Sequence, residues 1–120
     1  SLKPKTMCTL NILNRTNNGL LFYCTHSSLY NLSFNNLTFN FDAVEFDRFR
    51  VYLNSIDSAY WEKEYENSIY EKKIPIPTLQ NNFIILLNRH ELEELKILVD
   101  FSHRARLLAP EEINYKMIYN

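Results

Sequence analysis

The hydrophobic residues change their period within the first half of the chain, and this change constrains the fold more than any other feature. Residues 37–41 alternate between apolar and polar, which is typical of a strand with one buried and one solvent-exposed face. From Phe46 onward the apolar residues recur every three to four positions, as on one side of a helix. Asp42 precedes the second pattern, with Glu45 three residues further on, as in a capping box. The pattern predicts a strand followed by a helix over about 43–56.

The same order of turn, strand, cap and helix recurs 46 residues further along the chain, without a gap. In this register residues 83–87 correspond to residues 37–41, and the capping pair falls on Asn88 and Glu91. Agreement of four kinds of position in one register indicates an internal duplication. We therefore expect two copies of one strand-strand-helix unit.

A chain of 120 residues has the size of one ordinary domain. We predict a single domain of residues 1–120, with repeats at about 20–56 and 68–102 and a C-terminal segment, 103–120, that contains a short helix. The predicted fold class is α+β, built from a duplicated β-hairpin-plus-helix unit. Its strands are expected to combine into one antiparallel or mixed sheet, with two long helices on one face.

Turn-forming residues place the remaining strands. Gly19, the only glycine, follows two asparagines and predicts a turn before the β-prone residues 20–24. Residues 35–36, both asparagine, tolerate left-handed backbone geometry and predict a tight hairpin. Pro75 and Pro77 leave no hydrogen-bond donors on one side of their strand, which favours a sheet edge or an extended arm.

Charge and composition narrow the classes of function. Lys and Arg number 13 against 14 Asp and Glu, so the chain lacks the basic footprint of a dedicated nucleic-acid binder. No stretch approaches the roughly 18 apolar residues of a membrane span, and the first residues lack the apolar core of a signal peptide. Cys8 and Cys24, without a secretory signal, are expected to be free thiols, which predicts a cytoplasmic location.

Residues with recognisable chemistry are few. A chain with one glycine has no Gly-rich loop to hold a phosphate. His90 and Glu94 share a helix face, but the second histidine of the zinc-protease motif is missing. Cys24 and His26 do not make a zinc site by sequence, because the other cysteine is distant. We predict no catalytic residue, no cofactor and no metal.

Three segments carry a resemblance to known sequences: residues 30–37 (YNLSFNNL), residues 74–78 (IPIPT) and residues 88–95 (NRHELEEL). On these motifs the chain resembles a family of small uncharacterised proteins, with a domain of unknown function, from Bacteroidetes-type bacteria. The resemblance implies a bacterial, cytoplasmic origin. It implies no activity, ligand or catalytic residue.

The two repeats differ on the outer face of their second strand. Thr38 and Asn40 in the first repeat become Ile84 and Leu86 in the second, so residues 83–87 are apolar on both faces. An open apolar strand needs a cover. The C-terminal segment or a second copy of the chain could supply that cover, and we expect the segment to contribute to a homodimer. The candidate interaction surface is Ile84, Leu86, Leu107, Leu108, Ile113 and Met117.

The connector between the repeats is rich in aromatic residues. Tyr60, Trp61 and Tyr65 are candidate contacts for a ligand, although we favour a role in sealing the core. The aromatic residues, with Lys72 and Lys73 nearby, could stack on the bases of a single-stranded nucleic acid, but the equally dense acidic residues oppose its phosphate backbone.

Three classes of function remain open. The leading hypothesis is a non-enzymatic protein-binding or assembly module, whose partner is another protein or a second copy of this chain. The alternative is a small-molecule-binding or catalytic domain that uses the aromatic connector around Trp61. Binding of single-stranded nucleic acid has the least support, and no membrane partner is expected.

Overall fold

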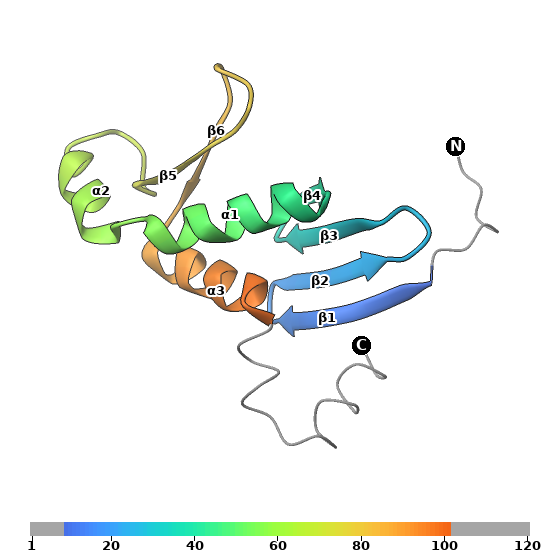
Figure 1. Ribbon diagram of the computed structural model, residues 1–120. Coiled ribbons are helices and arrows are strands. Elements are labelled where there is room, and N and C mark those ends of the chain that lie inside the picture. The colour runs from blue at the N-terminus through green and yellow to red at the C-terminus, as the bar shows by residue number, and fades with distance from the viewer. Residues whose placement is uncertain (1–8, 102–120) are drawn as a thin grey trace.

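The computed structural model describes residues 9–101, which form an α+β fold (Figure 1). The fold class predicted from the sequence is confirmed. In chain order the elements are β1 (Leu10–Thr16), β2 (Gly19–Cys24), β3 (Leu29–Phe34), β4 (Leu37–Phe41), α1 (Ala43–Ser55), α2 (Ser58–Glu64), β5 (Ile74–Pro77), β6 (Ile84–Leu87) and α3 (Arg89–Val99). The expected short C-terminal helix lies outside the described residues, as do four residues of the candidate surface: Leu107, Leu108, Ile113 and Met117.

The strands divide into two antiparallel sheets. The first four form a meander in the order β1-β2-β3-β4, and β5 pairs only with β6 within residues 9–101. The expectation that the strands of both repeats combine into one sheet is therefore wrong. Pro75 and Pro77 explain part of this separation, because neither residue has an N–H group to donate to a further strand beside β5.

Helices α1 and α3 cover one face of the four-stranded sheet and pack against each other (Figure 1). The aromatic rings of Tyr30 on β3 and Phe46 on α1 stack with their centroids 4.5 Å apart. Phe46 and Leu53 of α1 are buried, as the helical spacing predicts. The fully buried side chains of the core are Leu21, Leu32, Phe34, Leu53, Ile74, Leu92, Leu98 and Val99.

Strand β1 was not expected from the sequence. It pairs with β2, but the register shifts between Ile12 and Asn14, so Leu13 forms a bulge. The bulge interrupts the alternation of apolar and polar residues, which is the signal that predicts a strand. Leu13 packs against the core despite this irregularity.

Gly19 has a different role from the one its neighbours suggest. The chain does turn before β2, but Gly19 does not have a positive φ. A Cβ atom at this position would lie 2.4 Å from Cδ2 of Leu98, on α3. The glycine therefore permits the close approach of α3 to the sheet. In contrast, Asn35 has a φ of 54° and forms the predicted left-handed hairpin turn.

Both predicted capping boxes are present. The side chains of Asp42 and Glu45 satisfy the first turn of α1, and those of Asn88 and Glu91 do the same for α3. The connector after α1 contains a further helix, α2, which the sequence did not predict. Asp57 caps α2 by accepting a hydrogen bond from the backbone N–H of Tyr60.

The two predicted repeats share the order of hairpin, cap and helix but differ in their turns. Two residues separate the paired residues Phe34 and Leu37 in the first hairpin. Six residues, 78–83, separate Pro77 from Ile84 in the second. The duplication stays a prediction.

Cys24 is disulfide-bonded, and the described residues contain no free cysteine. The expectation of two free thiols is thus wrong for Cys24, while Cys8 lies outside the described residues. Separately, no helix within residues 9–101 combines the length and the apolar character that crossing a membrane requires.

Candidate interaction surface

The β5–β6 hairpin rises away from the helices as an arm (Figure 1). The register pairs Ile74 with Leu87 and Ile76 with Ile85 on the face that turns toward the core. Ile74, Ile76 and Leu87 are buried there. The arm is therefore anchored by one apolar face, which leaves the opposite face to be explained.

The opposite face of the arm borders a groove of about 350 Å³. We call it the hairpin groove. Its lining combines the hairpin with the connector that precedes it, namely Tyr65, Ser68, Tyr70, Lys72, Pro75, Ile84 and Leu86. The structure thus brings together two residues of the candidate interaction surface, Ile84 and Leu86, with one of the candidate aromatic residues, Tyr65.

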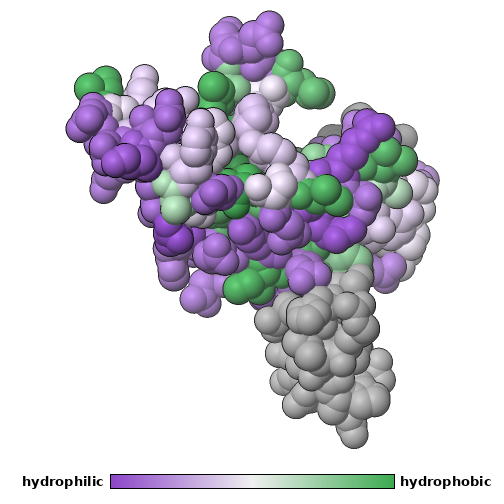
Figure 2. All heavy atoms as spheres, turned by 60° about the vertical axis from the view of Figure 1, so that its left-hand side comes forward, coloured by the Kyte–Doolittle hydropathy of each residue, from purple (hydrophilic) through white to green (hydrophobic). Residues whose placement is uncertain are grey.

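Large apolar side chains are exposed around the hairpin groove. Ile84 is 55% exposed, although it lies in a strand. Figure 2 shows hydrophobic residues directly below the hydrophilic tip of the protruding hairpin. Within residues 65–87, which contain the connector and the hairpin, the exposed large apolar residues are Tyr65, Ile69, Tyr70, Leu79, Phe83 and Ile84, of which Tyr65, Tyr70 and Ile84 line the groove.

Lys73 holds the connector in place on one side of the groove. Its ammonium group donates hydrogen bonds to the carbonyl and hydroxyl oxygens of Ser68, both at 3.1 Å, and to the carbonyl of Tyr70. The backbone carbonyls of Ser68 and Tyr70, in the segment between α2 and β5, thus each accept a hydrogen bond from Lys73. Tyr65 and Tyr70, which line the groove, lie on this fastened segment.

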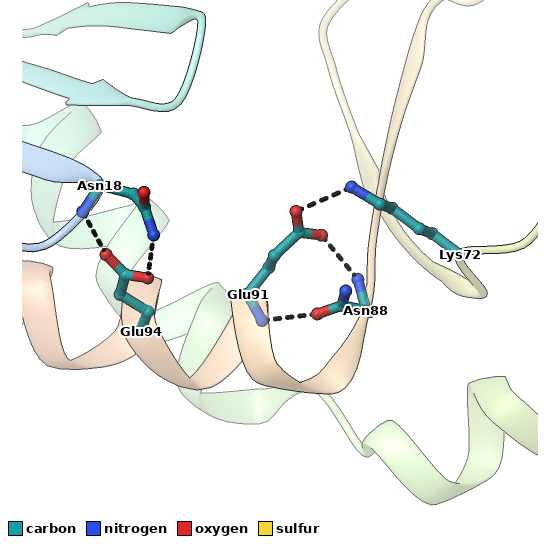
Figure 3. Close-up of polar contacts among 5 residues, drawn as sticks. All are labelled: Asn18, Lys72, Asn88, Glu91 and Glu94. Atoms are coloured by element: carbon teal, nitrogen blue, oxygen red, sulfur yellow. Dashed lines mark hydrogen bonds and ion pairs between the residues drawn. The ribbon is translucent and has the colours of Figure 1, made fainter.

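Glu91 holds the base of the hairpin (Figure 3). Its carboxylate accepts hydrogen bonds from Nζ of Lys72 at 2.7 Å and from the backbone N–H of Asn88 at 2.9 Å. Lys72 lies shortly before β5 and Asn88 directly follows β6, so one carboxylate joins both ends of the hairpin. The sequence predicted the cap but not the contact with Lys72.

The electrostatics of Glu91 follow from these partners. Partial burial raises the pKa of its carboxyl, but the hydrogen bond from Lys72, the N–H of Asn88 and the charge of Lys72 outweigh burial. The net pKa lies below its usual value, so Glu91 is an anion at neutral pH. Among the described residues that line the groove Lys72 is the only cation, and its ammonium group is thus paired within the chain.

His90 and Glu94 share a helix face, as two metal ligands could, but Glu94 has a structural role instead. The carboxylate of Glu94 accepts hydrogen bonds from the backbone N–H of Asn18 at 2.8 Å and from its side-chain Nδ2 at 2.9 Å (Figure 3). These bonds join α3 to the turn between β1 and β2. Within residues 9–101 no three His, Cys, Asp or Glu side chains are grouped so that they could hold a metal ion.

The three candidate aromatic residues lie in different surroundings. Trp61 packs against the core, and its ring stacks on Tyr65 with centroids 5.6 Å apart. Tyr60 is exposed and meets Trp61 edge-on. Trp61 does not line the hairpin groove, so of the three only Tyr65 does. An ion pair at 2.6 Å between Arg89 and Glu62 further fastens α2 to the start of α3.

A second hollow, of about 340 Å³, lies between the start of α1 and the end of α3. Sequence reasoning missed it, because its walls come from three separate parts of the chain. Of its three charged residues, Asp47 and Arg50 form an ion pair with each other, and Asp100 is the third. The full lining is Tyr30, Ala43, Phe46, Asp47, Arg50, Val99, Asp100 and Phe101.

The sequence profile of a protein family of unknown function matches residues 7–120. No curated protein and no solved structure matches the chain. These comparisons attach no substrate, ligand or partner to the hairpin groove.

Proposed function

We propose that this chain, which belongs to a family of unknown function (DUF6686), is a non-enzymatic module that binds a protein through its hairpin groove. The observation that carries the proposal is the exposure of Ile84 on a strand whose groove-facing neighbours are apolar or aromatic. Because nearly half of Ile84 is already covered, burying the rest of this side chain gains roughly 1 to 1.5 kcal/mol. A partner with an apolar surface obtains this gain.

The chemistry of the groove favours a protein partner over a charged ligand. Lys72 is paired with Glu91, and Lys73 is bonded to backbone and hydroxyl oxygens. The two lysines that would serve a nucleic-acid backbone are therefore engaged within the chain. Aromatic and aliphatic side chains without free charge are the usual composition of the centre of a protein interface.

The alternative, a small-molecule or catalytic site around Trp61, has less support. Such a site needs a pocket lined by Trp61 and Tyr65 together with a buried ionisable group. The hairpin groove contains Tyr65 but not Trp61. Among residues 9–101 the buried polar or charged set consists of Ser58 alone.

Origin and location belong to the proposal as well. The Bacteroidetes-type bacterial origin rests on the resemblance of the three sequence segments. The cytoplasmic location rests on the same resemblance and on the expectation that the cysteines are free thiols, which the disulfide bond of Cys24 opposes. Disulfides persist mainly in oxidising compartments, so the redox state of Cys24 distinguishes the cytoplasm from an oxidising compartment.

A photo-crosslinking experiment tests the proposed function. The photoreactive residue p-benzoylphenylalanine replaces Ile84 in cells that express the chain, and in a matched control it replaces Val51, which is 56% exposed on α1. We expect irradiation to give a discrete protein adduct from position 84, identified by mass spectrometry, and none from position 51. No adduct at position 84, or the same adducts at both positions, would show that the groove is not a binding surface.

A further inference from the structure

The two edges of the β5–β6 hairpin differ in their hydrogen-bonding groups. Pro75 and Pro77 have no N–H, so the β5 residues that bond to β6 are Ile74 and Ile76. The outer edge of β5 therefore offers carbonyl groups but no donors. This edge cannot accept a further strand in the ordinary pattern.

The outer edge of β6, in contrast, offers both N–H donors and C=O acceptors. Because Leu87 and Ile85 face Ile74 and Ile76, the backbone N–H and C=O groups of Ile84 and Leu86 point away from β5. No strand within residues 9–101 pairs with this edge. The hairpin thus presents one open edge, beside the side chains of Ile84 and Leu86 that border the groove.

We propose that the partner is a second copy of the chain, whose β6 pairs antiparallel with β6 across a twofold axis at Ile85. This inference deepens the proposed function and rests on it. In this register the N–H of Ile84 donates to the carbonyl of Leu86 in the second copy, and the N–H of Leu86 donates to the carbonyl of Ile84 there. The symmetry repeats both bonds in the opposite direction.

The sequence of β6 suits self-pairing. Residues 81–88 contain no charge, so an antiparallel copy brings no like charges together. In the proposed register the side chain of Ile84 lies next to that of Leu86 from the second copy, on the groove face. Asn82 lies opposite Asn88 of the second copy, which places neutral amides at the ends of the paired segment.

The prolines explain why pairing would stop at two copies. Joining two β6 edges gives a four-stranded sheet in the order β5-β6-β6-β5, whose outer strands both carry Pro75 and Pro77. Neither outer edge can donate to a third hairpin, so the assembly closes. An apolar strand that would otherwise promote aggregation is thereby used in a closed dimer.

The substitution Leu86→Pro tests the edge directly. It lies opposite Pro75 and removes an N–H that points away from β5, so the pairing of β5 with β6 keeps its bonds. We expect sedimentation of the unaltered chain at up to about 0.1 mM to show twice the monomer mass of 14.4 kDa. Leu86→Pro should weaken dimerisation at least about tenfold, because half of the proposed hydrogen bonds are lost. Leu86→Ala, which keeps the N–H, is the matched control and should weaken it less.

Amide hydrogen exchange gives a second measurement that does not depend on a substitution. In the dimer the N–H groups of Ile84 and Leu86 should exchange at least about tenfold more slowly than in dilute, monomeric protein. A chain that is monomeric at 0.1 mM, or a dimer in which these two amides exchange freely, would overturn the inference. A monomeric chain that still crosslinks from position 84 to a different protein would overturn self-pairing and leave the proposed function standing.

Discussion

The carboxylate of Glu91 and the ammonium group of Lys72 form an ion pair at 2.7 Å that joins the first turn of α3 to the residues leading into β5. The two residues are 19 positions apart in the sequence. Because Glu91 also completes the cap of α3, one side chain ties the orientation of the hairpin to the helix that anchors it.

Glu91→Gln should destabilise the fold in a way that depends on pH. The pKa of Glu91 is lowered in the folded state, so its contribution is present above the unfolded value of 4.5 and is lost as the pH falls through the folded value. We expect a loss of about 1 kcal/mol of unfolding free energy near pH 7 and a smaller difference near pH 3. Chemical denaturation at both pH values measures this. Glu93→Gln, an exposed position on the same helix, should show little loss, and a constant difference for Glu91→Gln would contradict the ion-pair explanation.

Gly19→Ala should destabilise the fold through contact with Leu98. The added Cβ would lie 2.4 Å from a side chain that is fully buried, so we expect a cost of about 1 to 3 kcal/mol. Leu98→Ala alone should cost about 2 to 5 kcal/mol by leaving a cavity. The double variant should lose less than the sum of the two, because the clash is gone. Additive costs in denaturant melts would instead point to a conformational role for Gly19.

Lys73→Met should loosen the connector that lines the groove. The substitution removes the donors that serve the oxygens of Ser68 and the carbonyl of Tyr70, so we expect a loss of about 1 kcal/mol of stability. Amide exchange in residues 66–73 should rise more than elsewhere. Lys63→Met, at an exposed position on α2, is the control. Equal exchange in both variants would show that Lys73 does not fasten the segment.

Cys24 should resist thiol reagents until it is reduced. Protein purified without reductant and unfolded in the presence of a maleimide should gain no mass at Cys24, and prior reduction should allow labelling. Mass spectrometry of the peptide that contains Cys24 measures both states. Labelling without reduction would show that Cys24 is a free thiol, as the sequence predicted. That result would also support a location in a reducing compartment.

Local signals in the sequence were sufficient for the elements that depend on neighbouring residues. The capping pair Asp42 and Glu45 acts over three residues, and so does the pair Asn88 and Glu91. The turn at Asn35 also depends on the backbone preference of one residue. Each of these features has its main determinants within three residues of one another, so a short window of sequence is sufficient to predict it.

Tertiary structure decided the features that join distant residues. The bulge at Leu13 makes β1 irregular, and only its pairing with β2 shows that it is a strand. The need for a glycine at position 19 comes from Leu98, on a helix at the other end of the described chain. The hairpin groove likewise exists only because Tyr65 and Ile84 are brought together. Packing between distant segments depends on shape and burial in three dimensions, which a one-dimensional period does not encode.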